Sequence, residues 1–139
     1  MEYDAKKPHH VRVFDVVDGG KALANGRVFC GTADGQAHGV PDGIRVDTCG
    51  NLWAAVAEGV HVFSPAGVLI AKIVITPGAA NCAFGGPDGN DLLMTAHESV
   101  WLITTKATGS GDIGPNEAGA GKKAEIPLSL VTCSEPRRV

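Results

Sequence analysis

An internal repeat of short strand-like segments is the strongest constraint on the fold of this chain. The segment 44–55 aligns with 82–96 as strand, turn and strand, and the second copy has the longer turn. The segment 59–63 then aligns with 99–103, which lies 40 positions later. A repeat of about 40 residues that holds four strands is typical of a β-propeller blade. The repeat therefore predicts an all-β fold, a partial β-propeller of about two and a half four-stranded blades.

Composition supports short strands rather than long helices. The 139 residues include 19 Gly and 8 Pro, and Gly is about twice as frequent as the usual ~7%. These residues divide the apolar and β-branched runs into short pieces, and no window has the period of a helix. The acids Asp18, Asp47 and Asp88 are predicted to be ordinary turn residues.

Charge and hydropathy exclude several classes of partner. Acids number 15 and bases 12, which gives a net charge of -3, and the charges are scattered. Nucleic acids and anionic membrane surfaces require clustered Lys and Arg, so neither is expected as a partner. No apolar run approaches the roughly 18 to 20 residues that cross a bilayer. The residues after Met1 lack the apolar stretch of a secretory signal, so a cytoplasmic location is expected.

The repeat divides the chain into five parts. Residues 1–31 supply the outer strands of a partial blade, 32–75 a complete blade, 76–105 three strands of the next, 106–124 a flexible Gly-rich loop, and 125–139 a candidate last strand and a tail. Propellers close with about four to eight blades, so this chain is expected not to close a ring alone. The exposed blade edges are expected to promote self-association.

The motifs resemble one known family in their order and spacing. They are 39–55 (Gly-Val-Pro-Asp-Gly-Ile-Arg-Val-Asp-Thr-Cys-Gly-Asn-Leu-Trp-Ala-Ala), 59–67, 81–86, 92–96 and 99–103. This stretch, about 9 to 105, resembles the C-terminal part of the senescence marker protein/gluconolactonase/luciferin-regenerating enzyme family. The resemblance implies a six-bladed propeller that binds a divalent cation, often calcium, in its axial tunnel and hydrolyses lactones.

The resemblance assigns a metal-binding and a catalytic role to Asp42. The family holds its cation with a Glu, two Asn and the Asp of a Pro-Asp-Gly motif, which corresponds here to Pro41-Asp42-Gly43. Positions for the Glu and both Asn are expected to precede Met1, so activity of this chain alone is not expected to match that of a full member. Calcium is the expected cation, with zinc as an alternative. Without the resemblance, the motif predicts an ordinary turn whose Asp bonds its own backbone.

Two further residues are candidates for substrate binding. Asn81 begins the inner strand of the second blade and either lines the tunnel or caps the strand. His38 precedes Asp42 by four residues and lies near the expected funnel. Trp53 and Trp101 are predicted to pack between blades, whereas His97 is predicted to be exposed in a loop between strands.

The four cysteines do not form a recognisable zinc or redox motif. Cys30, Cys49, Cys82 and Cys133 are separated by 19, 33 and 51 positions, which favours free, partly buried thiols, with a disulfide as the alternative. Two functions remain open. The chain is either a truncated member of a family of divalent-metal-dependent lactone hydrolases, acting on a small-molecule lactone, or a non-catalytic propeller fragment that serves as a scaffold or interaction module.

Overall fold

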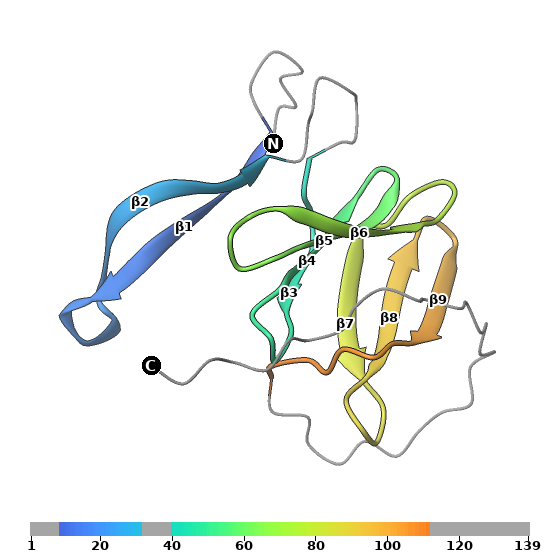
Figure 1. Ribbon diagram of the computed structural model, residues 1–139. Helices are drawn as coiled ribbons and strands as arrows, with labels where there is room; N and C mark the ends of the chain where they lie inside the picture. Colours follow the sequence, from blue (N-terminus) through green and yellow to red (C-terminus); the bar gives the residue numbers. More distant parts are fainter. Residues whose placement is uncertain (1–8, 32–39, 112–139) are drawn as a thin grey trace.

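The described part of the chain is built from three consecutive antiparallel β-sheets (Figure 1). The computed structural model describes residues 9–31 and 40–111. The first sheet contains β1 (His10–Val17) and β2 (Ala22–Gly31), joined by the short 3-10 turn η1 (Asp18–Gly20). The second contains β3 (Ile44–Val46), β4 (Leu52–Val56), β5 (Gly59–Phe63) and β6 (Leu69–Val74). The third contains β7 (Asn81–Gly85), β8 (Asp91–Ala96) and β9 (Ser99–Thr104). The all-β prediction is confirmed, and the strand order β3-β4-β5-β6 is the meander expected of a blade.

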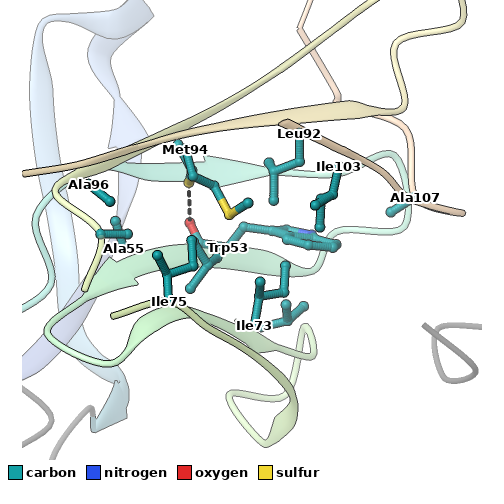
Figure 2. Close-up of a cluster of buried hydrophobic side chains, with 13 residues drawn as sticks. Trp53, Ala55, Ile73, Ile75, Leu92, Met94, Ala96, Ile103 and Ala107 are labelled. Atoms are coloured by element: carbon teal, nitrogen blue, oxygen red, sulfur yellow. Dashed lines mark hydrogen bonds between the residues drawn. The ribbon is translucent and has the colours of Figure 1, made fainter. Parts of the chain in front are cut away.

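The second and third sheets pack face to face around a cluster of buried apolar side chains (Figure 2). Side chains alternate along a strand, so β4 directs Trp53 and Ala55 toward the third sheet. From that sheet, β8 contributes Leu92 and Met94, which are almost fully buried. The Trp53 ring meets Phe84 edge to face, with ring centroids 5.1 Å apart and an interplanar angle of 81°. This packing places β7 against β3 and β4.

One end of the β1–β2 hairpin packs on the opposite face of the second sheet. Cys30 of β2 packs with Leu52, Ala54 and Phe63 in a second, smaller apolar cluster. All residues of strands β4 and β5 are buried. This explains why their sequences are almost continuously apolar, as expected for strands between two layers.

The turn between β3 and β4 is organised by one buried carboxylate. Asp47 is 1% exposed and its carboxylate accepts four hydrogen bonds. One oxygen accepts from the backbone N–H groups of Cys49 and Asn51, each at 2.9 Å. The other accepts from the Asn51 amide at 2.8 Å and from the indole Nε1 of Trp53 at 2.9 Å. Asp47 is predicted only to be a turn residue; in the structure its carboxylate also organises the turn and holds the Trp53 indole in its orientation.

The segment that follows β9 ties the second and third sheets together at one end (Figure 1). The carbonyl of Thr108 accepts from the N–H of Thr48 at 2.8 Å, in the turn after β3. The N–H of Gly109 donates to the carbonyl of Gly89 at 3.0 Å, in the turn before β8. The segment therefore satisfies backbone groups of both turns at once.

The structure corrects two predictions, the burial of Trp101 and the free thiol of Cys49. Trp101 is 40% exposed, whereas Trp53 is 1% exposed. Trp101 lies on β9, at the outer edge of its sheet, where no further described strand covers it. Cys30 and Cys82 are free and buried, as predicted for thiols, but Cys49 is disulfide-bonded. The linear spacing of cysteines does not reveal which of them meet in space.

Several predictions lie outside the described residues. These are His38, the predicted loop 106–124 beyond residue 111, and the predicted last strand and tail at 125–139. Within the described ranges, no helix is long and apolar enough to cross a membrane.

Replacing Asp47 by Ala is expected to lower the free energy of unfolding by about 2–4 kcal/mol. The substitution leaves the buried Trp53 indole N–H and the Asn51 amide without their acceptor, and unsatisfied buried donors are costly. Urea denaturation followed by tryptophan fluorescence measures the change. Asp88→Ala, in the exposed turn before β8, is the matched control and is expected to change stability by less than about 0.5 kcal/mol. Equal effects from the two variants would contradict the assigned role of Asp47.

Candidate functional site

Asp42 lies at the end of the second sheet where the innermost strand β3 begins. Its backbone N–H donates to the carbonyl of Ala55 at 2.9 Å, and the carbonyl of Gly43 accepts from the N–H of Ala55 at 2.8 Å. The β3–β4 pairing therefore extends through the two residues before β3, which holds the Asp42 backbone in place. Asp42 itself is exposed, so its carboxylate is open to solvent and ligands.

A pocket of about 290 Å³ lies beside Asp42. Three connections meet there: the β4–β5 turn, the β6–β7 connection and the β8–β9 turn. The lining residues are Val40, Asp42, Val56, Ala57, Pro77, Gly78, Ala79, Ala80 and His97. The pocket is therefore built by both packed sheets, and the Asp42 carboxylate is its acidic group.

Asn81 begins β7, and its side chain lies directly against Gly43. The N–H of Gly43 donates to the carbonyl of Ala80 at 3.0 Å. A Cβ added to Gly43 would overlap Oδ1 and Cγ of Asn81 and would lie 2.8 Å from its Cα. Position 43 thus requires the absence of a side chain so that β3 and β7 can approach. The structure therefore brings the start of β3, which comes just after Asp42, next to the start of β7 at Asn81.

The Asn81 side chain is partly committed to its own strand. Its Oδ1 accepts a hydrogen bond from the backbone N–H of Cys82 at 2.8 Å. The two N–H donors of the side-chain amide remain available to a ligand at this exposed position. The amide oxygen of Asn81 thus caps the strand, as one of the two predicted alternatives expects. Substrate binding through the amide nitrogen stays a prediction.

Two residues near these strand starts were not identified as site candidates from the sequence. His97, in the β8–β9 turn, lines the pocket beside Asp42 and has a φ of +49°. Arg45, on β3, lines a second pocket of about 170 Å³ together with Asn81 and Thr95. The sequence signal for Arg45 is a single cation among the apolar residues of the innermost strand. No sequence signal places His97 beside Asp42, because 55 positions separate them and only the packing of the sheets joins them.

Cys82 lies in the wall between the two sheets and is not suited to act as a nucleophile. It is 2% exposed, and its thiol donates to the carbonyl of Trp53 at 3.8 Å. Burial raises the pKa of Cys82 to about 11, although the nearby Arg45 cation acts in the opposite direction. The thiol is therefore neutral at physiological pH, and reactive cysteines need the thiolate.

The described residues fit a divalent cation only in part. Asp42 supplies one or two carboxylate oxygens, which are ligands of the kind that hard cations prefer. Across residues 9–31 and 40–111, no group of three or more His, Cys, Asp or Glu is placed to hold a metal ion. Calcium takes roughly six to eight oxygens, so any cation at Asp42 needs ligands from outside this set.

Comparison with known proteins gives a consistent family match. The sequence profile described as the SMP-30/Gluconolactonase/LRE-like region matches residues 5–98. A gluconolactonase of Zymomonas mobilis is 37% identical over 73 residues, which cover 51% of this chain and 20% of that protein. The pentonolactonase XacC of Haloferax volcanii is 33% identical over 92 residues, covering 64% of this chain and 29% of that protein.

Solved structures show the same likeness. A luciferin-regenerating enzyme superposes with a TM-score of 0.58 at 30% identity, covering 64% of this chain and 31% of that one. The gluconolactonase XC5397 of Xanthomonas campestris gives a TM-score of 0.58 at 32% identity, covering 67% of this chain and 29% of that one. The chain thus spans less than a third of the length of these relatives and solved structures.

Replacing Gly43 by Ala is expected to separate the starts of β3 and β7. The added methyl group has no room beside Asn81, so the strands or the Asn81 side chain must shift. The expected cost is about 1–3 kcal/mol of unfolding free energy, measured by urea denaturation. Gly31→Ala is the control, because a Cβ there meets no neighbouring atom within 4 Å. A Gly43→Ala variant as stable as the control would show that the close approach of the strands is dispensable.

The Cys82 thiol is expected to make stability depend on alkaline pH. The raised pKa means that the folded chain keeps a proton which the unfolded chain releases above its ordinary value of 9.0. The free energy of unfolding should therefore fall as the pH rises from 9 to 11, by about 2–3 kcal/mol from this group. Urea denaturation at stepped pH should show a shallower fall for Cys82→Ala than for the parent chain. Parallel pH profiles of the two proteins would rule out the raised pKa.

Proposed function

Since the chain belongs to the SMP-30/gluconolactonase/LRE-like family, we propose that it forms part of a divalent-metal-dependent lactone hydrolase. The observation that supports this most directly is the position of Asp42. Its exposed carboxylate stands at the pocket where both packed sheets contribute residues, at the start of an innermost strand. The names of the relatives, gluconolactonase and pentonolactonase, support a sugar-derived lactone as the small-molecule substrate.

In this proposal Asp42 has two roles, as a ligand of the cation and as a proton acceptor. When bound, a divalent cation such as calcium, or alternatively zinc, polarises the lactone carbonyl and lowers the pKa of an attacking water. Asp42 accepts the proton that this water loses as it adds to the carbonyl carbon. The ring C–O bond then breaks, and Asp42 returns the proton to the leaving ring oxygen, which becomes a hydroxyl group of the open-chain hydroxy acid.

The chain's own residues supply the rest of the site in part. The amide N–H donors of Asn81 are available to hydrogen-bond the substrate hydroxyls. His38 was predicted as a second substrate contact and lies outside the described residues. Further acidic cation ligands are expected from outside the described residues, because these offer a single acidic group at this pocket. The cytoplasmic location stays a prediction.

A second candidate function is that of a non-catalytic scaffold or interaction module. Large apolar side chains remain exposed on the outermost sheets of the described chain, including Val16, Leu23 and Val28 on the hairpin and Val100 and Trp101 on β9. Such surfaces, together with unpaired strand edges, promote association with another chain. Size-exclusion chromatography with light scattering measures this association. An oligomer without metal binding or lactone hydrolysis would favour the scaffold.

We expect the purified full chain, as an oligomer, to hydrolyse lactones. This activity should require both a divalent cation and Asp42. Proton release from glucono-lactone and a pentono-lactone is measured with calcium or zinc and then with excess chelator, after subtraction of spontaneous ring opening. Asp42→Ala is expected to reduce the rate at least about 100-fold, because it removes both a metal ligand and the proton acceptor.

Asp88→Ala is the matched control, since it removes one carboxylate from an exposed turn outside the pocket. Circular dichroism verifies that each variant folds. An Asp42→Ala variant that folds and retains the parent rate would remove Asp42 from the mechanism. A parent chain without turnover in any metal or oligomeric state would contradict the lactonase proposal.

A further inference from the structure

We propose that Arg45 forms the anion-binding group of a second pocket beside the Asp42 site, and that this pocket binds the carboxylate of a small hydroxy acid. The pocket has a volume of about 170 Å³ and is lined by Arg45, Asn81, Cys82, Ala83, Leu93 and Thr95. It has a cationic group, polar groups and an apolar wall. The inference deepens the proposed function, on which the link to lactone hydrolysis rests.

The topology explains why Arg45 reaches this pocket. Arg45 pairs with Trp53 across the β3–β4 ladder, and directly paired residues point to the same face of a sheet. Trp53 faces the third sheet, so Arg45 is directed toward β7 as well. Strand β3 lies against β7, whose first residue is Asn81. Arg45 therefore lines a pocket together with residues of β7 and β8 although it belongs to the second sheet.

The charge of Arg45 is not neutralised by the described part of the chain. One of its nitrogens, Nη1, donates to the backbone carbonyl of Ile44 at 2.6 Å. Arg45 forms no ion pair with any residue in the ranges 9–31 and 40–111. The carboxylate of Asp47 is already occupied by four donors of its own turn. The neighbouring Cys82 is a neutral thiol, so it does not supply a counter-charge.

These groups match one class of ligand. A guanidinium has five N–H donors in a planar fork and binds carboxylates through two parallel hydrogen bonds. The amide of Asn81 and the hydroxyl of Thr95 line the same pocket and suit the hydroxyls of a sugar acid. Opening a lactone generates such an acid, with one carboxylate and several hydroxyls. The pocket therefore fits the product of the proposed reaction.

The position of the pocket relative to Asp42 supports this assignment. Asn81 lines the Arg45 pocket, while the preceding residue, Ala80, lines the Asp42 pocket. Gly43, next to Asp42, abuts the Asn81 side chain. The two pockets are thus neighbours along the start of β7. A product released at Asp42 has a cationic group close by that holds its new carboxylate.

Isothermal titration calorimetry of the full chain with sodium gluconate tests the proposal. Excess chelator is present, so that binding through a metal ion cannot contribute. Glucitol is the neutral comparison, because it has the hydroxyls of gluconate but no carboxylate. We expect gluconate to bind and glucitol to bind at least about tenfold more weakly. We also expect Arg45→Gln to weaken gluconate binding at least about tenfold, and Arg45→Lys to weaken it less.

Arg27→Gln is the matched control for loss of one positive charge. Arg27 lies on the hairpin in an exposed ion pair with Asp15, and such pairs contribute little to stability. Its variant is expected to bind gluconate like the parent chain. Gluconate binding that is absent in the parent, equal for glucitol, or unchanged in a folded Arg45→Gln variant would overturn the proposal.

The outcome is distinguishable from failure of the proposed function. Arg45-dependent gluconate binding by a chain without lactonase activity would leave the anion site in place and contradict only the hydrolase. Lactonase activity that requires Asp42, in a chain whose gluconate binding ignores Arg45, would contradict only the anion site.

Discussion

The packing of Trp53 between two sheets is the contact on which the rest of this structure depends. Its indole N–H is held by the buried Asp47 carboxylate, and its ring meets Phe84 from the neighbouring sheet. The first contact belongs to a local turn, whereas the second joins separate repeats. Through this one side chain, the turn between β3 and β4 is linked to the packing of β7 on the second sheet. Both pockets described above lie along this contact between the sheets.

The approach of the two innermost strands also shows how a small structural requirement creates a site. Gly43 leaves the space in which the Asn81 side chain lies. Asp42, immediately before it, remains exposed while its backbone is held by β4. Asp42 is an exposed acid on a fixed backbone. It lies beside the neutral amide of Asn81 and near Arg45, which has no ion-pair partner among the described residues. This arrangement is the basis of the proposed lactone site and anion pocket.

Much of the fold could be predicted from the sequence, and less of the site. Alternating apolar residues and turn-forming Gly, Pro and Asp are local signals, so the strands and the turn at Asp47 were predictable. The exposure of a residue at the edge of a sheet was not predictable from the sequence, because burial depends on which other strands cover that residue. Trp53 and Trp101 both lie on strands, yet only Trp53 has a sheet on its ring. The pairing of Cys49 likewise depends on proximity in space.

The sequence by itself determined the strand and turn pattern, the blade-like repeat, and the position of Asp42 and Asn81 at the starts of two inner strands. Only the tertiary structure decided that Arg45 shares a pocket with Asn81 and that His97 lines the pocket of Asp42. Periodicity records which face of its own strand a side chain occupies. The packing angle and offset of two sheets determine which residues of distant strands meet. Both depend on many side chains at once, so the local sequence pattern does not predict them.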